Sequence, residues 1–306
     1  MSTPCLSIII PSFNRPELLP RSVGSALRQT LKAIEVIVVD DGSIPAVTLP
    51  EQANLRVIRL EPNQGGAAAR NQGVKAARSR WITFLDDDDV LLPEMAAKAM
   101  AAVQQIPPTL PAPIALLFGL NIVNSAGQVL ETHRPPTLPK GAHFCLEEIP
   151  AEQSFFSKQT LVIERDVFLA MGGFDANFTS RIHTELFLRL NPVCSLWGIP
   201  DITYHLSAHT GDRVSTNPQR RQQSFEQLLA KHHDLFMSHS RQKFADFVFN
   251  HAEMLHRSGQ GWLATKALQR ALWIDPLHTI ARLGSPYKRQ MMQKLSPLRR
   301  IAPLSF

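Results

Sequence analysis

Short apolar runs that alternate with helical patterns constrain the fold of this chain more than any other feature. Ser7–Pro11 and Ile34–Val39 are runs rich in β-branched residues that end in a proline or before carboxylates, as buried parallel strands often do. Between them, Glu17–Thr30 carries apolar residues at helical spacing. We interpret this stretch as a strand, a helix and a second strand, which together form a βαβ unit.

The alternation continues to about residue 105. It predicts strands at Leu55–Leu60 and Trp81–Leu85, and helices at Gly66–Arg78 and Pro93–Gln105. A further strand is expected at Ile114–Gly119. The fold class is therefore α/β, with a mostly parallel sheet flanked by helices. From Gln219 onward the pattern is helical, and the predicted helices are Phe225–Phe236, Phe244–Leu255 and Trp262–Trp273.

Composition narrows the class of protein. The chain has 306 residues, 44% of them hydrophobic and 19% charged, which is typical of an ordered globular protein. It has no apolar run of about 20 residues and no signal-peptide pattern, so we expect a cytoplasmic protein. Its three cysteines, Cys5, Cys145 and Cys194, lie far apart, which argues against a disulfide framework and a zinc site.

The net charge of +6 is spread thinly, so no nucleic-acid partner is expected. Much of the excess lies late in the chain, at Arg220–Arg221, Lys288–Arg289 and Arg299–Arg300. We interpret these residues as a solvated helical surface, with contact to a membrane or a polymer as the alternative.

Four consecutive carboxylates, Asp86–Asp89, follow directly after a predicted buried strand. Like charges crowded together are electrostatically unfavourable, so a cation is expected beside them. In an extended segment Asp86 and Asp88 point the same way. Carboxylates together with diphosphate oxygens suit Mg²⁺ or Mn²⁺. The alternative is a solvated acidic turn in which Asp89 caps the next helix.

Two further polar segments are weak signals by themselves. Asp40 and Asp41 precede Gly42-Ser43, a common turn sequence. Gln64-Gly65-Gly66 is similar to a phosphate-binding loop at the start of a helix. It lacks the spacing of a Walker loop or of a dinucleotide fingerprint, and neither of those folds is supported.

The order of the motifs carries more information than any one of them, and over residues 5–105 it resembles the family 2 glycosyltransferases with the GT-A fold. The resemblance rests on four segments in the order and at the spacing of that family. They are Leu6-Ser7-Ile8-Ile9-Ile10-Pro11-Ser12-Phe13-Asn14-Arg15, Val38-Val39-Asp40-Asp41-Gly42-Ser43, Asn63-Gln64-Gly65-Gly66 with Ala69-Arg70-Asn71-Gln72-Gly73, and Phe84-Leu85-Asp86-Asp87-Asp88-Asp89.

The resemblance implies a site for a nucleotide-diphosphate sugar. Pro11 would begin the loop that lines the base, with Ser12 and Asn14 also in the nucleotide site. Asp41, or its neighbour Asp40, would accept a hydrogen bond from a ring nitrogen of the base, which favours uridine.

The remaining donor-side roles concern the ribose, the diphosphate and the cation. The resemblance places Arg70 near the base or diphosphate and Asp87 near the ribose. It also implies that Arg213 would neutralise the charge of the leaving group. Asp88 and Asp86 would hold Mn²⁺ or Mg²⁺. His209 is a further candidate ligand of the metal, ahead of His205.

A second resemblance covers the acceptor side. Met171-Gly172-Gly173-Phe174-Asp175 and the later Glu185-Leu186-Phe187-Leu188-Arg189-Leu190 are similar to segments of the same family. The family's general base is an Asp whose position falls here on His183, a departure from the pattern. Either His183 or Glu185 has suitable chemistry, and we slightly favour Glu185 because the family uses a carboxylate.

These resemblances imply a hexosyltransferase-type enzyme that transfers a sugar, with a UDP-sugar as the expected donor, to a hydroxyl group with inversion. The acceptor would be a glycan, a lipid-linked molecule or a protein, as in polysaccharide biosynthesis. We predict a GT-A domain over residues 1–216, with nucleotide-sugar binding in 1–105 and the acceptor side in 106–216. We predict a helical region over 217–306, whose basic residues form a solvated surface or, as the alternative, a peripheral contact with the inner face of a membrane. Two alternatives stay open: an inactive nucleotide- or sugar-binding scaffold, and a nucleotidyltransferase.

Overall fold

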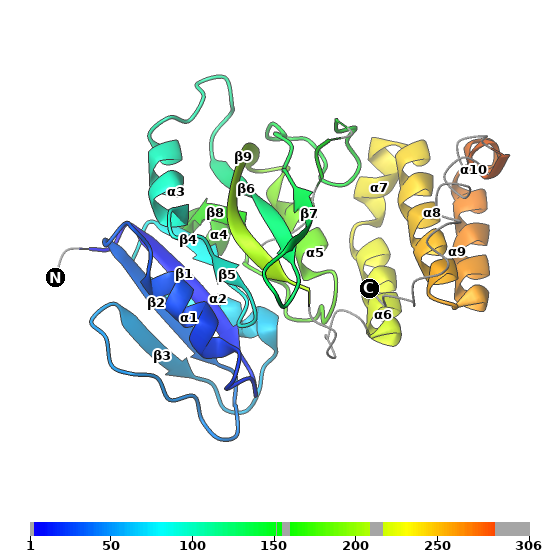
Figure 1. Cartoon of the computed structure of the whole chain (residues 1–306). Coiled ribbons are helices and arrows are strands. Elements are labelled where there is room, and N and C mark those ends of the chain that lie inside the picture. Colours follow the sequence, from blue (N-terminus) through cyan, green and yellow to red (C-terminus); the bar gives the residue numbers. More distant parts are fainter. Residues whose placement is uncertain (1–2, 151, 155–159, 209–216, 285–306) are drawn as a thin grey trace. The chain divides into compact units, whose positions relative to one another are not determined.

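A computed structural model describes residues 3–150, 152–154, 160–208 and 217–284. The first part of the chain contains a sheet and its flanking helices (Figure 1). These elements are β1 (Leu6–Ser12), α1 (Leu19–Leu27), β2 (Ile34–Asp40), β3 (Leu55–Arg59), α2 (Gly66–Ala76), β4 (Trp81–Phe84), β5 (Val90–Leu91), α3 (Met95–Val103), β6 (Ile114–Val123), β7 (Val129–His133), β8 (Leu161–Glu164), α4 (Arg165–Ala170), α5 (Ile182–Leu190) and β9 (Ser195–Ser207).

The strand order is β3-β2-β1-β4-β8-β6-β9-β5, and β7 pairs with β6. The first four strands are parallel, as the alternating pattern predicts. Beyond β4 the sheet is mixed, because β8 runs antiparallel to both β4 and β6 while β6 and β9 are parallel. The expectation of a mostly parallel sheet thus describes the N-terminal half, and the half beyond β4 has a mixed topology.

The strand residues alternate between two faces of the sheet, and helices cover both. Ile8 and Ile10 of β1 share a core with Val23 of α1 and Ala96 of α3. Figure 1 shows α1 crossing the face of β1 and β2. On the opposite face α2 lies so close that a Cβ on Gly73 would stand 2.4 Å from Ile9 Cγ2. This alternation buries both faces of the sheet.

The last part of the described chain is helical, as predicted. The predicted helix Phe225–Phe236 is two helices in the structure, since the chain leaves the helical conformation at His232. Helices α8 and α9 pack through the small side chains of Ala252, Ala264 and Ala267. The helices are α6 (Pro218–Lys231), α7 (His233–His239), α8 (Arg241–Arg257), α9 (Gly261–Ile274) and α10 (Pro276–Gly284).

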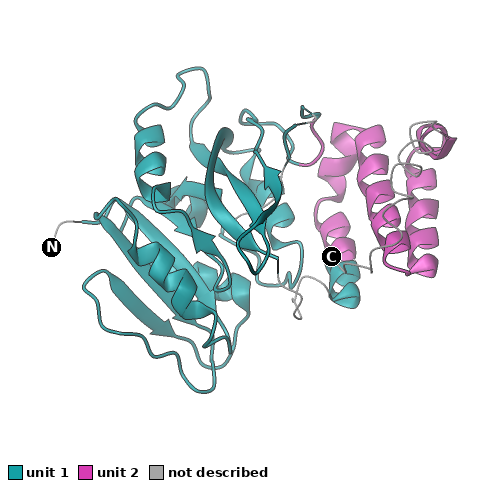
Figure 2. Cartoon of the chain, in the orientation of Figure 1, with its two compact units in different colours: residues 1–144, 148–224 teal, residues 145–147, 225–306 magenta. Residues whose placement is uncertain are grey.

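Two compact units divide the chain (Figure 2). The first holds residues 1–144 and 148–224 and contains the whole sheet; the second holds residues 145–147 and 225–306. Within the described residues, none of the helices has the length and apolar character that crossing a bilayer would require.

Candidate functional site

The order in which strands are added to the sheet reverses next to β1. From β1 the chain adds β2 and then β3 on one side, and it returns to place β4 on the other side. The loops after β1 and β4 therefore meet at the carboxyl ends of neighbouring parallel strands, where open α/β sheets bind their ligands. These two loops contain Ser12–Arg15 and Asp86–Asp89.

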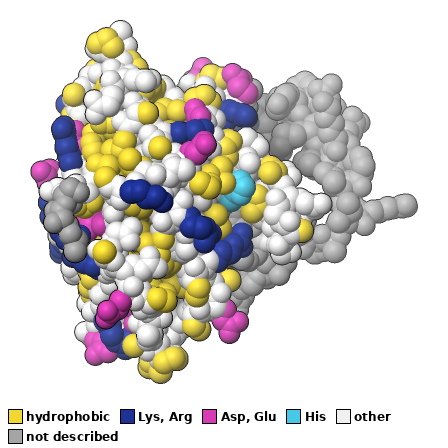
Figure 3. Space-filling view, turned by 60° about the vertical axis from the view of Figure 1, so that its left-hand side comes forward, with side chains coloured by type: hydrophobic (Ala, Val, Ile, Leu, Met, Phe, Trp, Pro, Cys, Tyr) yellow, Lys and Arg dark blue, Asp and Glu magenta, His cyan; other side chains and the backbone are white. Residues whose placement is uncertain are grey.

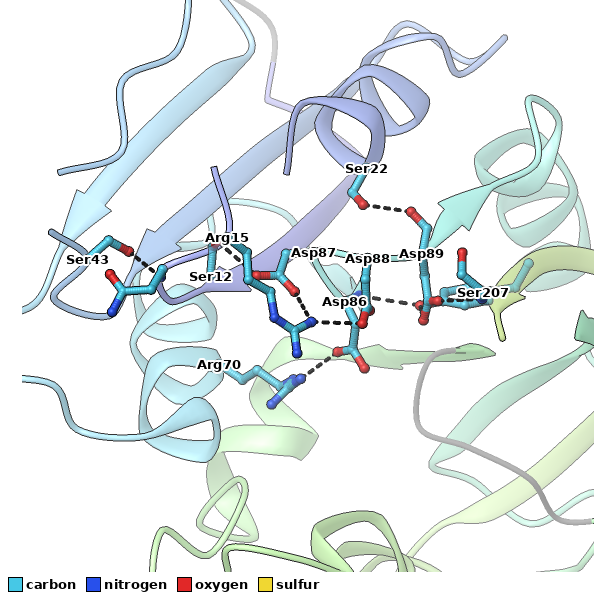
Figure 4. A network of polar contacts seen from close by, with 12 residues as sticks. Ser12, Arg15, Ser22, Ser43, Arg70, Asp86, Asp87, Asp88, Asp89 and Ser207 are labelled. Atoms are coloured by element: carbon cyan, nitrogen blue, oxygen red, sulfur yellow. Dashed lines mark hydrogen bonds and ion pairs between the residues drawn. The ribbon is translucent and has the colours of Figure 1, made fainter. Parts of the chain in front are cut away.

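Arg15 joins the two loops. Figure 4 shows its guanidinium between two carboxylates, with Nη1 donating to Asp87 Oδ1 at 3.0 Å and to Asp88 Oδ2 at 2.7 Å. Burial opposes the charge of Arg15, but the two carboxylates outweigh this effect and raise its pKa. Arg15, from the loop after β1, thus partly neutralises the acid run Asp86–Asp89 in the loop after β4.

Asp87 is buried against the loop after β1. Its Oδ2 accepts a hydrogen bond of 2.9 Å from Ser12 Oγ. Burial raises the pKa of Asp87 to about 6, although Arg15 and Ser12 both favour its charged form. The structure therefore brings Ser12, Arg15 and Asp87 together, as the motif order suggests for Ser12 and Asp87.

Arg70, on α2, is buried and pairs with Asp86 (Figure 4). Its Nη1 also donates to Gly66 O at 2.8 Å. Within the described residues, the buried Nε of Arg70 has no hydrogen-bond partner. A buried donor of this kind is uncommon and favours a ligand with an acceptor atom at this position.

Asp89 has a structural role. Its carboxylate accepts hydrogen bonds from Tyr204 Oη at 2.7 Å and from Ser207 N at 2.8 Å, both on β9. Burial raises the pKa of Asp89 and also that of Tyr204. The Tyr204 hydroxyl additionally accepts a hydrogen bond from Asp86 N at 3.3 Å. Asp89 therefore fixes the acidic loop to β9, and it does not cap the next helix.

Asp40 lies inside the loop that follows β2. It accepts hydrogen bonds from Ser43 N at 2.9 Å and from Val47 N at 3.0 Å. It also forms an ion pair with Arg59 Nη1 at 2.5 Å. Burial alone would raise its pKa, but these donors lower it. Asp40 thus stabilises the local backbone.

Asp41 connects the loop after β2 to the loop that begins α2. Its Oδ1 accepts from Gln64 N and its Oδ2 from Gly65 N, each at 2.8 Å. Asn63 Nδ2 donates to the same Oδ2 at 3.0 Å. Of the two predicted base-binding carboxylates, Asp41 is the one that lies beside the glycine-containing loop.

Pro11 and Asn14 differ in their setting. Pro11 is the sixth residue of β1, so the loop begins after Ser12. Asn14 adopts a left-handed conformation, with φ of 53°. Its backbone N donates to Ser43 Oγ at 2.9 Å and its Oδ1 accepts from Ile44 N at 2.8 Å. Asn14 thereby holds the loops after β1 and β2 together.

The two predicted base candidates, Glu185 and His183, lie on α5 but have different environments. Glu185 is fully buried, at 0% exposure, and Arg189 donates to both of its oxygens at 2.6 Å. Arg189 also donates to Met171 O and Gly173 O. His183, in the first turn of α5, is half-buried. The geometry gives Glu185 a packing role and does not favour it as a base.

Asn71 is a residue that sequence reasoning did not single out. Its Oδ1 accepts from Phe174 N at 2.9 Å and its Nδ2 donates to Phe174 O at 2.8 Å. One amide side chain on α2 thus satisfies both backbone groups of a residue 103 positions later. Its position next to Arg70 in the third motif was the available signal.

The donor set suits a cation that is shared with a ligand. Among the residues that the structure describes, no group of three or more His, Cys, Asp or Glu side chains is placed to hold a metal. Asp86 and Asp88 provide two carboxylates at one loop. Mg²⁺ is commonly held by one or two carboxylates plus phosphate oxygens and water, so these residues fit such an ion. The predicted ligand His209 and the predicted Arg213 lie outside the described residues.

Comparison with known proteins identifies the family. Residues 7–131 match the family model described as glycosyl transferase family 2. These residues are a family 2 glycosyltransferase region. The matched residues include β1, β2 and the Asp86–Asp89 run, so Arg15, Arg70 and the four aspartates lie within this family 2 glycosyltransferase region, whereas α5 with His183 and Glu185 lies beyond it.

Relatives of this family 2 glycosyltransferase occur in bacteria. An uncharacterized glycosyltransferase of Haemophilus influenzae is 28% identical over 73% of this chain and 75% of the relative. The succinoglycan biosynthesis protein ExoO of Rhizobium meliloti is 38% identical, over 34% of this chain and 32% of the relative. The chain thus spans three quarters of the first relative and about a third of the second.

The fold of this family 2 glycosyltransferase is also found in solved structures. The crystal structure of S. aureus TarS in complex with UDP-GlcNAc has a TM-score of 0.63 at 19% identity, and the match covers 90% of this chain and 83% of that chain. At this level of identity the similarity establishes the shared fold.

Proposed function

We propose that the chain transfers a sugar from a nucleotide-diphosphate sugar, with a UDP-sugar as donor, to a hydroxyl group of an acceptor. The observation that carries this proposal is the meeting of Arg15, Asp87 and Asp88 at the reversal point of the sheet, beside the buried Arg70. The UDP-GlcNAc named for TarS supports uridine as the base. The name of ExoO supports a place in polysaccharide biosynthesis.

The protein residues position the donor and balance its charge. We infer that Asp41 and the loop after β1 contact the base, and that Asp87, which is bonded to Ser12 and Arg15, contacts the ribose. The unpartnered Nε of Arg70 offers a donor to a phosphate or base oxygen. A divalent cation held by Asp86 and Asp88 would supply Lewis-acid stabilisation of the departing diphosphate.

We assign the general base to His183, in place of the slightly favoured Glu185. Glu185 is enclosed and its carboxylate is neutralised by Arg189, so an acceptor hydroxyl has no access to it. The half-buried His183 lies in the first turn of α5, six residues before Arg189. Deprotonation of the acceptor by this residue during in-line attack would give inversion at the anomeric carbon.

Calorimetry with UDP, GDP and CDP, each with and without Mn²⁺, tests the donor part of the proposal. We expect UDP to bind in the presence of Mn²⁺, and Asp88→Ala to abolish that binding. Arg70→Ala should reduce it less, because Arg70 contributes one of several contacts. Comparable losses for the two variants would contradict the metal role of Asp88, and absence of any nucleotide binding would contradict the donor assignment.

A screen of UDP-sugars and acceptors separates an enzyme from an inactive scaffold of the same fold. An enzyme releases UDP in the presence of an acceptor, or slowly by hydrolysis of the donor. UDP binding without turnover across many acceptors would favour the scaffold. The nucleotidyltransferase alternative predicts release of pyrophosphate from UTP and a sugar 1-phosphate, which separate reactions with these two substrates can detect.

The helical unit carries the second part of the proposal, a peripheral contact with anionic membranes. Trp262 and Trp273 on α9 are 74% and 81% exposed. They are 11 residues apart, which places them within about 20° on one helix face. Lys266 lies 5.7 Å from the Trp262 ring, and Leu277 on α10 is also exposed. Exposed aromatic and basic residues are typical of interfacial helices.

The charge of the chain supports the same contact. Of the net charge of +6, the last 22 residues contribute +5, because they contain five Lys or Arg residues and no Asp or Glu. On the face of the molecule in Figure 3, by contrast, basic and acidic side chains are interspersed. An anionic surface would thus attract the C-terminal end of the chain selectively.

Co-sedimentation with vesicles tests this contact. We expect binding to vesicles that contain phosphatidylglycerol and weaker binding to phosphatidylcholine vesicles. The double variant Trp262→Ser/Trp273→Ser should lose at least half of the bound fraction, whereas Val129→Ser, at an exposed apolar residue of β7, should not. Equal binding by all three proteins would contradict the role of the α9 face.

A further inference from the structure

Arg15 is a cation that the structure places on the acid run, and motif comparison gave it no role. A single atom, Nη1, donates to Asp87 at 3.0 Å and to Asp88 at 2.7 Å. Asp88 is also the residue that would hold the divalent cation. A carboxylate oxygen binds Mg²⁺ at about 2.1 Å, so a guanidinium on the same carboxylate would lie within a few ångströms of the ion. Two cations at that separation repel each other.

The two arginines of the site differ in their freedom to change partners. The Arg70 side chain is 9% exposed and is held by Asp86 and by Gly66 O. The Arg15 side chain is 30% exposed and stands on the loop after β1, at the opening between the strands. A guanidinium is suited to bidentate binding of phosphate. Of the two, Arg15 is the one that can exchange a carboxylate for a phosphate.

We propose that Arg15 occupies Asp88 in the donor-free protein, gives up this carboxylate when the divalent cation binds, and then binds the diphosphate. The inference rests on the proposed function, since it needs a diphosphate and a cation at this site. This exchange of partners by Arg15 would make the binding of the cation and the binding of the nucleotide favour each other. The cation alone competes with Arg15, whereas the cation and diphosphate together give Arg15 a new anionic partner.

Loss of Arg15 should consequently have effects of opposite sign on the two ligands. Without the competing guanidinium, Mn²⁺ alone should bind more tightly. Without the phosphate contact, UDP with Mn²⁺ should bind more weakly. A residue that merely braced the loop by neutralising it would not produce this pair of effects, because removing it would strengthen or weaken both.

The experiment measures Mn²⁺ alone, and UDP at saturating Mn²⁺, by calorimetry on the full chain, with correction for the Mn²⁺ that UDP binds in solution. For Arg15→Gln we expect Mn²⁺ alone to bind about 10-fold more tightly and UDP about 10-fold more weakly, which is a typical contribution of one charge-assisted contact. Arg15→Lys should lie between Arg15→Gln and the natural chain. Arg28→Gln, at the exposed C-cap of α1, is the matched control and should change neither value.

The outcomes separate this inference from the proposed function. If the natural chain binds UDP with Mn²⁺ but Arg15→Gln shifts both affinities in the same direction, or neither, the exchange of partners is wrong and the glycosyltransferase proposal stands. If UDP does not bind the natural chain at all, the proposed function fails and the exchange fails with it. A tighter Mn²⁺ site in Arg15→Gln would then show only that Arg15 and the cation compete.

Discussion

Arg189 closes a bidentate ion pair on the carboxylate of Glu185, with both distances 2.6 Å, one helical turn after it on α5. The same guanidinium donates to the backbone oxygens of Met171 and Gly173. Arg189, held in place by Glu185, therefore links α5 to the turn that follows α4. The residue that the family resemblance slightly favoured as a base is, in the structure, a buried residue that stabilises the packing of α5.

Glu185→Gln should lower the free energy of unfolding by about 2–3 kcal/mol, because breaking a buried ion pair leaves Arg189 with an uncompensated charge. Urea denaturation measures this change. Replacing both partners, as in Glu185→Gln/Arg189→Met, should recover part of the loss. Unchanged stability together with abolished transfer would mean that Glu185 is the base after all.

His183→Asn should lower kcat by about 10²–10⁴-fold, the usual contribution of a general base. Stability should change by no more than about 0.5 kcal/mol, because the residue is half-buried in the first turn of α5. Steady-state kinetics and thermal unfolding on the same preparation give both values. A kcat close to that of the natural chain would remove His183 from the mechanism.

Gly73→Ala should destabilise the first unit by about 1–3 kcal/mol, because a Cβ there would lie 2.4 Å from Ile9 and 3.2 Å from Val39. Gly261→Ala, at the start of α9, is the matched helix control, since its Cβ would meet nothing within 4 Å. Denaturant unfolding should show a loss for the first variant and none for the second. Equal stability of the two would contradict the close approach of α2 to the sheet.

Glu35 should make stability depend on pH. Burial alone would raise its pKa, but hydrogen bonds from Ser7 and Arg78 and the charge of Arg56 lower it below its ordinary value. A carboxyl with a lowered pKa in the folded state contributes stability above its unfolded pKa of about 4.3, and this contribution disappears as the pH falls through the folded pKa.

Glu35→Gln should therefore lower the Tm at pH 7, and the difference from the natural chain should shrink below about pH 4. Thermal unfolding of both proteins from pH 7 to pH 3 measures this. A constant difference over that range would show that the effect of Glu35 comes from packing and not from its charge.

Local patterns predicted the first half of the fold because its elements follow strict periodicities. The runs at β1, β2 and β4 are continuous and apolar, and α1 has clear helical spacing of its apolar residues. The second half was not predictable in the same way. Strand β9 contains Gly198 and Pro200 and has irregular register against β6, so its pattern resembles a loop. Strand β5 has only two residues.

The candidate site was predictable in composition but not in its contacts. The order of motifs indicated Ser12, Asp87 and Asp88, whereas the pairing of Arg15 with Asp88 depends on β4 lying next to β1. The Glu185–Arg189 pair could be predicted from the sequence, since residues four apart share a helix face. The sequence does not show that the face of α5 with Glu185 is buried. That burial decides whether Glu185 acts as a base or stabilises the packing of the helix.

Asn71 connects α2 to a segment about 100 residues later in the first unit. Its amide is bonded to both the N and O of Phe174, next to the arginine that pairs with Asp86. Exchange of the segment around Phe174 between relatives is therefore constrained at this position. A grafted segment must present a free backbone N and O to Asn71, or we expect the graft to disturb the neighbouring Arg70 and weaken the proposed donor site.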